Sequence, residues 1–425
     1  MRKSWFKLDN AAKIFSHVDS DYITTVFRMS HVLNQTIDPE VLKRALDEVM
    51  DYFYYFKVKL KKGLFWYYLE DQDAPLKLFK DEGPPCRRII SNDTNGYLFR
   101  VLYTENTISC EFHHLLSDGT GCLTFLNTLV TKYAELLGIP VDFNEMNRDY
   151  HQPVNEAEAV DSYRQIAKHH PHVKPKIEKE QRVFHIKGHI VSSDRYFVTT
   201  ATLPLADLYQ LAKSYDTKVT EFLAALYLQT FLEIQDEQVK VKRRHKPVAL
   251  QLPINLRRRL PSESLRNFTL YITPGVKPTT NRDLKSIIEE VRTYIRKRTK
   301  QDHLIEMIVQ NYKTESSPFL RILPRILKDL TMPIFYKAIG VDLFSGALSN
   351  IGNVDLPKGL TELVKEVHFV LGPCPISKSN LAVTGYQDTL TLNFGRVIKD
   401  AKVERKFLRK LVEMGIDVTV KQGGR

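Results

Sequence analysis

The stretch HHLLSDG, from His113 to Gly119, follows the apolar run TISCEF (107–112) and precedes GCLTFLNTLVTKYAELLG (121–138). The first run is typical of a β-strand, and the second repeats apolar residues at helical spacing, with Gly138 in the C-cap position. Imidazole is the one side chain whose ordinary pKa lets it take and return a proton near neutral pH. If the turn after the strand is tight, Asp118 folds back and fixes the loop, and Gly119 permits a backbone conformation that side chains disfavour. The stretch therefore favours a catalytic base on a rigid loop.

Two other interpretations of the same residues stay open. The adjacent histidines are also compatible with a buried pair that backbone carbonyls satisfy. A metal site using His114 and Asp118 is possible chemically, but no third ligand lies at a recognisable spacing, so we expect no metal. The chain carries no GxSxG, GxGxxG, P-loop or HExxH motif, so no enzyme nucleophile is indicated. A general base that acts directly on a substrate hydroxyl or amine fits the residues present.

Length and composition indicate two domains in a globular protein. The chain has 425 residues, of which 43% are hydrophobic and 26% are charged, enough for two domains of about 200 residues. No continuous apolar run is typical of a transmembrane helix, and the N-terminus lacks the apolar region of a secretory signal. The four cysteines form no CxxC pair, which favours reduced thiols and a cytoplasmic protein.

The net charge of +12 is concentrated in three basic clusters, at 239–247, 256–260 and 292–300. None of them interleaves aromatic residues with the basic ones, and no nucleic-acid-binding motif occurs, so we expect no nucleic-acid partner. The clusters predict either a solvated basic face or a site that attracts an acidic substrate or carrier.

Strand and helix signals alternate in the first half of the chain. Residues 21–33 are rich in β-branched and aromatic residues, and 38–53 repeats apolar residues at helical spacing, with Asp38 as N-cap and Pro39 at the first helical position. Two hairpins follow, with turns at 61–63 and 105–106. This order predicts an α/β fold.

The second half begins after a change in composition. Residues 145–182 are polar, with few large apolar residues, and are predicted to be a surface crossing; the histidines near 170 belong to it. Residues 219–235 are apolar almost all round, which predicts a buried helix with Thr220 as N-cap. The strand signals end at 389–397, before a last helix near 401–414. We therefore predict an N-terminal lobe at 1–180, which includes the crossover linker, and a C-terminal lobe at 181–425.

HHLLSDG matches the HHxxxDG motif of the acyltransferase superfamily that includes chloramphenicol acetyltransferase, plant acyl-CoA-dependent transferases and peptide-synthetase condensation domains. Other stretches resemble its alcohol acetyltransferase and condensation-like branch, in order and over nearly the whole chain. They are WFKLDNAAKIF (5–15), VTEFLAALYL (219–228), LPINLRRRLPSESLRNFTLYI (252–272), LSNIGNVDLP (348–357) and TLNFGRV (391–397). Where plant members carry DFGWG, this chain has Asn393-Phe394-Gly395-Arg396, so only Phe394 and Gly395 match.

The resemblance implies a fold and a role for each residue of the motif. The fold would be two chloramphenicol acetyltransferase-like lobes, each a mixed β-sheet with helices, with an active-site tunnel at their interface. His114 would be the base, beside His113 and Gly119, and Asp118 would be structural. We expect Arg257 to pair with Asp118 through a bidentate ion pair; the alternative is a surface arginine beside Arg258 and Arg259.

The resemblance also implies an oxyanion donor and a reaction. Ser349 or Asn350 would stabilise the tetrahedral intermediate, although Asn350 is also suited to cap a turn. The implied reaction is transfer of an acyl group from acyl-CoA, used as a co-substrate with no tightly bound cofactor, to an alcohol or amine. The acceptor would be a small or lipid-like molecule, and the default oligomeric state is a monomer. Alternatives are a condensation enzyme supplied by an acyl or peptidyl carrier protein, and a non-catalytic scaffold that keeps the fold.

Overall fold

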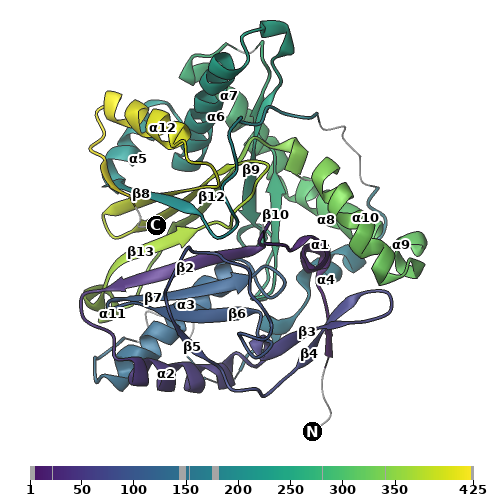
Figure 1. Cartoon of the computed structure of the whole chain (residues 1–425), viewed down its shortest axis with the longest axis vertical. Helices are drawn as coiled ribbons and strands as arrows, with labels where there is room; N and C mark the ends of the chain where they lie inside the picture. The colour runs from purple at the N-terminus through teal and green to yellow at the C-terminus, as the bar shows by residue number, and fades with distance from the viewer. Residues whose placement is uncertain are drawn as a thin grey trace.

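The computed structural model describes residues 5–21, 23–142, 150–152, 154–174, 181–279, 281–339 and 341–422. Within these ranges the protein is built on three β-sheets, of five, eight and three strands. The two larger sheets form two lobes, each a mixed β-sheet with helices, as the resemblance implies (Figure 1).

The first lobe holds the five-stranded sheet in the order β13-β2-β7-β6-β5. Its strands are β2 (Val26–Leu33), β5 (Leu78–Lys80), β6 (Phe99–Tyr103), β7 (Thr107–His113) and β13 (Val364–Val370). Helices α2 (Pro39–Tyr52) and α3 (Gly119–Leu136) cover one face, where Phe112 of β7 packs on Phe125 of α3. The predicted N-cap is confirmed, because the Asp38 side chain accepts from the backbone N–H groups of Glu40 and Val41.

The second lobe holds the eight-stranded sheet, in the order β10-β9-β12-β14-β15-β8-β16, with β11 paired to β9. Its strands are β8 (Phe197–Pro204), β9 (Val248–Asn255), β10 (Thr269–Ile272), β11 (Gly275–Val276), β12 (Gly346–Asn353), β14 (Ser379–Tyr386), β15 (Thr389–Arg396) and β16 (Thr419–Gln422). The helices on its outer face are α5 (Leu205–Ser214), α6 (Val219–Gln238), α7 (Leu284–Arg298) and α12 (Lys402–Glu413). Helix α6 is buried on nearly every side, as its apolar sequence predicts.

Two features join the lobes. Strand β13 follows α11 (Leu360–Leu363) in the second half of the chain, yet it pairs antiparallel with β2 of the first lobe. A group of helices lies at one side of both sheets, next to the small sheet β1-β4-β3 (Figure 1). The helices are α1 (Asn10–Val18), α4 (Ser162–His169), α8 (Gln301–Glu315), α9 (Pro318–Ile322) and α10 (Arg325–Ile339). The strands are β1 (Trp5–Lys7), β3 (Val58–Lys62) and β4 (Tyr67–Asp71). The lobe boundary at residue 180 stays a prediction.

Three local predictions are wrong. The crossing at 145–182 is not all surface: its described part includes α4, whose Tyr163 is buried against Phe268. Thr220 is not the N-cap of α6, because the helix starts at Val219 and Glu221 accepts from the backbone N–H of Lys218 at 3.1 Å. The strand signals do not end at residue 397, because β16 follows α12 and pairs with β8. For α4 and β16 a tertiary contact overrides the local pattern, whereas at α6 a local capping contact between Lys218 and Glu221 moves the helix start.

Candidate active site

The HHLLSDG loop starts where β7 ends. The backbone N–H of His114 donates to Thr25 O at 2.8 Å, and the N–H of Leu116 donates to His113 O at 2.9 Å, which closes a tight turn. Helix α3 then begins at Gly119, two residues before the predicted start. The loop is therefore held at both ends by regular structure.

Asp118 fixes this loop to the second lobe. It is the N-cap of α3, where Oδ1 accepts from the backbone N–H groups of Thr120 and Gly121 at 3.1 and 3.2 Å. Its other oxygen, Oδ2, accepts from the Phe268 N–H at 2.8 Å and from the Thr269 hydroxyl at 3.0 Å, both near β10. Together with the hydrogen bond from Arg257, the carboxylate accepts five hydrogen bonds. Its lone pairs are therefore occupied by structural hydrogen bonds, and it is not placed to act as a base.

Arg257 lies beside Asp118, and Nη1 donates to Asp118 Oδ2 at 2.8 Å. The expected bidentate geometry is wrong. The other guanidinium N–H groups donate to backbone carbonyls, Nε to Ser264 O at 2.7 Å and Nη2 to Arg266 O at 2.6 Å. The planar guanidinium thus joins the α3 N-terminus to the segment before β10, because its donors point in several fixed directions.

His114 lies in an apolar environment and retains partial exposure. Its ring packs against Phe27 and Phe15, with centroids 4.4 and 5.2 Å away. Burial lowers the pKa of His114 to about 4, although the nearby Asp118 carboxylate acts in the opposite direction. At neutral pH the imidazole is therefore neutral and has a lone pair available for a proton.

His113 is turned into the protein and is 4% exposed. Its ring contacts the Thr25 hydroxyl at 3.0 Å, accepts from the Leu115 N–H at 3.1 Å, and lies 3.6 Å from the Asp19 carboxylate. The two histidines therefore differ in surroundings: His113 has several polar contacts, whereas aromatic rings flank His114.

Asn267 is a residue that the sequence did not single out. Its side-chain Nδ2 donates to His114 O at 2.7 Å and to Asp9 Oδ2 at 3.1 Å. Asp9 in turn is the N-cap of α1, accepting from Ala12 N at 2.8 Å. Asn267 therefore ties the backbone of His114 to α1. Only the tertiary fold brings these three segments together.

Gly119 was expected to adopt a backbone conformation that side chains disfavour. This prediction is wrong, because Gly119 is not one of the glycines with a positive φ. A side chain there would meet Met29 Cε at 3.3 Å and Ile351 Cγ2 at 3.9 Å, so the residue leaves room for the approach of β2 and β12. The stricter requirement falls on Gly121, where a Cβ would lie 2.0 Å from Ser117 Oγ and 2.3 Å from Leu265 O.

Replacing Gly121 with alanine tests this close approach. We expect Gly121→Ala to lower the free energy of unfolding by about 1–3 kcal/mol, because the methyl group overpacks the contact between the lobes. Gly119→Ala is the matched control in the same helical turn, since the nearest atom to its methyl group is the end of the flexible Met29 side chain at 3.3 Å and not a backbone atom. Urea unfolding followed by circular dichroism measures both. Equal stability of the two variants would contradict the prediction.

The two candidate oxyanion donors lie on opposite faces of β12. Asn350 points to α6, where Nδ2 donates to the Thr220 hydroxyl at 2.9 Å, and its Oδ1 accepts from Gly352 N at 2.8 Å. Ser349 pairs with Ala382, which belongs to the core of the first lobe, so its side chain is on the face toward α3. Asn350 is therefore engaged by α6 and by its own turn, and the oxyanion role of either residue stays a prediction.

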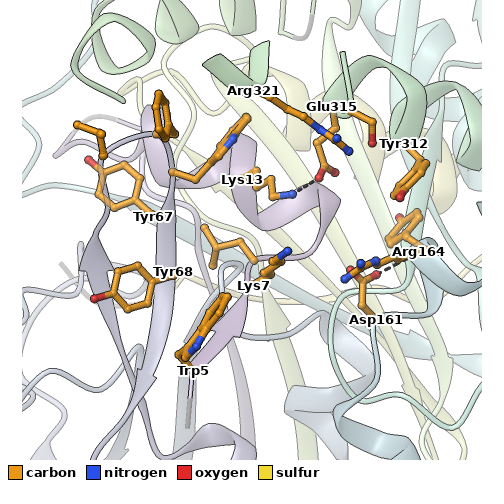
Figure 2. Close-up of a pocket in the computed structure, with 16 residues that line it drawn as sticks. Trp5, Lys7, Lys13, Tyr67, Tyr68, Asp161, Arg164, Tyr312, Glu315 and Arg321 are labelled. Carbon is orange, nitrogen blue, oxygen red and sulfur yellow. Dashed lines mark hydrogen bonds and ion pairs between the residues drawn. The ribbon is translucent and has the colours of Figure 1, made fainter. Parts of the chain in front are cut away.

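A large pocket opens beside α1. Its volume is about 850 Å³, and Figure 2 shows aromatic and charged side chains around it. The labelled residues are Trp5, Lys7, Lys13, Tyr67, Tyr68, Asp161, Arg164, Tyr312, Glu315 and Arg321. His114 is not among its lining residues. Helix α1 separates the two, because it places Lys13 in the pocket and Phe15 against His114.

A smaller pocket of about 380 Å³ lies at the start of α8. Four of its lining residues are cations, Arg258, Arg259, Arg296 and Lys300, and none is an acid. Arg258 also approaches strand β12, since its Nη2 would lie 3.3 Å from a Cβ at Gly352. Helix α8 runs from Gln301 at this basic pocket to Glu315 at the aromatic one, and its 15 residues span about 22 Å.

Among the residues that the structure describes, no group of three or more His, Cys, Asp or Glu side chains is arranged to hold a metal ion. No helix within the described ranges has the length and apolar character needed to cross a membrane.

The fold is that of condensation domains, which share the two-lobed chloramphenicol acetyltransferase-like architecture. The chain is similar to polyketide synthase associated protein 5 from Mycobacterium tuberculosis, at TM-score 0.60 and 14% identity, over 96% of this chain and 98% of that one. It is similar to the starter condensation domain of rhizomide synthetase RzmA, at TM-score 0.55 and 13% identity, covering 96% and 95%. A variant of that domain in complex with C8-CoA gives TM-score 0.59 and 15% identity, covering 96% and 94%. No protein-family model and no curated protein matches the sequence.

Proposed function

We propose that this protein is an acyltransferase that moves an acyl group from a thioester to an alcohol or amine. The observation that carries the proposal is His114, neutral at physiological pH and held on a loop that Asp118 and Arg257 lock across the two lobes. A base of this kind needs both properties, an unprotonated ring and a fixed position.

The reaction follows from these residues in two steps. His114 accepts the proton of the acceptor hydroxyl or amine as its oxygen or nitrogen attacks the thioester carbonyl, which gives a tetrahedral oxyanion. The C–S bond then breaks, the electron pair leaves with sulfur, and the imidazolium returns its proton to the thiolate. Ser349, on the face of β12 toward α3, is the candidate donor to the oxyanion. Direct transfer in a ternary complex needs no enzyme nucleophile.

The proposed donor is acyl-CoA, used as a co-substrate. The four cations of the basic pocket suit the phosphates of coenzyme A, because arginine and lysine form charge-assisted hydrogen bonds with phosphate oxygens. The similar starter domain in complex with C8-CoA supports a thioester of this kind. The acceptor would be a small or lipid-like alcohol or amine. Its path from the aromatic pocket past helix α1 to His114 is part of the proposal, because His114 does not line that pocket. A continuous tunnel between these openings stays a prediction.

The basic pocket gives a specific kinetic prediction. We expect Arg259→Ala combined with Lys300→Ala to raise KM for acyl-CoA about tenfold, because phosphate contacts of about 1.4 kcal/mol in total are lost. The same acyl group on N-acetylcysteamine carries no phosphate, so its KM should not change. Arg243→Ala with Arg244→Ala, which removes two exposed charges elsewhere, is the control. An equal rise in KM with both thioesters would contradict a phosphate site.

Release of free thiol is the assay for the proposed function. Acyl-CoA donors from acetyl to palmitoyl are tested against a panel of alcohols and amines. Turnover that depends on the acceptor supports the proposal and gives the acyl length. If no acyl-CoA reacts but an acylated carrier protein does, the protein is the carrier-supplied condensation enzyme. If no thiol is released with either donor, the proposal is overturned and the non-catalytic scaffold is favoured.

A further inference from the structure

Helices α9 and α10 expose an apolar stripe. Ile322, Ile326, Leu330 and Ile334 lie four residues apart and are 69%, 71%, 70% and 69% exposed. Residues at this spacing fall on one side of a helix, so the stripe continues along α10. Such large exposed apolar groups gathered on one surface mark an interaction site more often than scattered ones do.

The opposite side of α10 buries polar groups. Lys328 is fully buried, where Nζ donates to Phe65 O at 2.8 Å and lies 3.5 Å from the centre of the Trp66 ring. Asp329 accepts from the Tyr67 hydroxyl at 3.2 Å, and its Oδ1 lies 2.6 Å from His17 Nδ1. A helix at a water-exposed surface normally places its apolar residues inside and its polar residues outside. Among the α10 side chains that the structure describes, Ile326, Leu330 and Ile334 show the reverse arrangement to Lys328.

The turn between β3 and β4 extends the exposed stripe. The backbone N–H of Arg325 donates to Leu64 O at 2.9 Å, which joins this turn to α10. Leu64 is 74% exposed and Phe65 41%, and Trp5 of the adjacent β1 is 60% exposed. The two tryptophans of the chain, Trp5 and Trp66, line the aromatic pocket together with Leu64 and Phe65. The pocket therefore opens beside this surface.

The charges around the surface are predominantly basic. Lys62 and Arg321 are exposed next to it, and Lys7 lies in the adjacent pocket. The nearby acids Glu315 and Asp329 already have cationic partners in Lys13 and Arg325. A second copy docked face to face would bring like charges together, whereas an anionic bilayer would complement them.

We infer that this surface docks on an anionic membrane. Trp5, Leu64, Phe65, Ile322, Ile326, Leu330 and Ile334 would enter the headgroup boundary, and the basic residues would contact lipid phosphates, as in other interfacial amphipathic elements. The docking does not depend on the proposed reaction. The further step, that the pocket beside it collects a lipid-like acceptor from the bilayer, rests on the proposed function.

Vesicle flotation tests the docking with the full chain. We expect binding to phosphatidylcholine vesicles that contain about 30% phosphatidylserine, and weaker binding to phosphatidylcholine alone. Ile326→Glu combined with Leu330→Glu should weaken binding about tenfold or more, because two apolar insertions become charged. Val412→Glu combined with Val420→Glu changes two exposed valines outside this surface, 54% and 52% exposed, and should leave binding unchanged.

Three results would overturn the inference. They are no binding to anionic vesicles, an equal loss in the control variant, and a dimer in sedimentation equilibrium that Ile326→Glu with Leu330→Glu dissociates. Turnover of soluble short-chain substrates, measured in parallel, reports on the proposed function alone. A failure of docking is therefore distinguishable from a failure of the chemistry, because the two readouts share no component.

Discussion

His114→Ala is expected to slow acyl transfer by about 10²–10⁴-fold, the usual contribution of a general base. The imidazole is neutral at physiological pH, and alanine leaves the acceptor proton without a base in the site. Thiol release with saturating substrates measures the effect on kcat. Circular dichroism and urea unfolding of the same variant check that the fold is intact, since a truncated ring also leaves space beside Phe27.

The pH profile separates a base from a structural histidine. If His114 is the base, its neutral form is the active one, so activity should fall as pH decreases through the pKa of His114, which burial lowers to about 4. The acid limb of kcat/KM is therefore expected near pH 4 and not near the ordinary value of 6.5. The residual kcat/KM of His114→Ala should not show this acid limb. A variant that keeps both the wild-type rate and the limb would exclude His114 as the base.

Arg257→Leu is expected to cost about 3–5 kcal/mol of unfolding free energy, because it leaves the buried Asp118 carboxylate without its cation. The two side chains are only 11% and 3% exposed, so water cannot replace the lost partner. The carbonyls of Ser264 and Arg266 also lose their donors. Urea unfolding measures the change.

The exposed neighbour Arg259 provides the control, since Arg259→Leu should change stability by less than about 0.5 kcal/mol. Arg257→Lys restores one charge but not the planar set of donors, so it should recover part of the stability and of kcat. If Arg257 acts only by positioning the loop, Arg257→Lys should lower kcat more than it raises KM, both relative to the wild type. Full stability in Arg257→Leu would show that the ion pair is not needed.

Much of the fold could be predicted where local pattern and burial agree. Helix α2 begins at Pro39 with Asp38 as its N-cap, as the sequence predicts, and the apolar helix α6 is buried. The contact between Asp118 and Arg257 was expected from the resemblance, and their side chains meet at 2.8 Å. The catalytic roles of the site residues stay predictions.

The parts of the fold and of the site that the sequence did not predict depend on contacts between segments distant in the sequence. The described part of the polar stretch 145–182 includes α4 because Tyr163 finds a partner in Phe268, which no local pattern contains. Helix α10 was not expected, and its apolar side faces outward while Lys328 is buried. A glycine is needed at position 121 because the carbonyl of Leu265, distant in sequence, approaches it closely, and the side chain of Asn267 donates to the carbonyl of His114. Sequence spacing does not report such pairs.

Helix α8 separates the basic and the aromatic openings by about 22 Å, and this spacing bears on the order of events in a catalytic cycle. If the donor enters at the basic pocket and the acceptor at the aromatic one, as proposed, the two substrates do not obstruct one another, and the spent donor need not leave before the acceptor binds. Initial rates measured at several fixed concentrations of one substrate should then give intersecting double-reciprocal lines. Parallel lines would mean that the first product leaves before the second substrate binds.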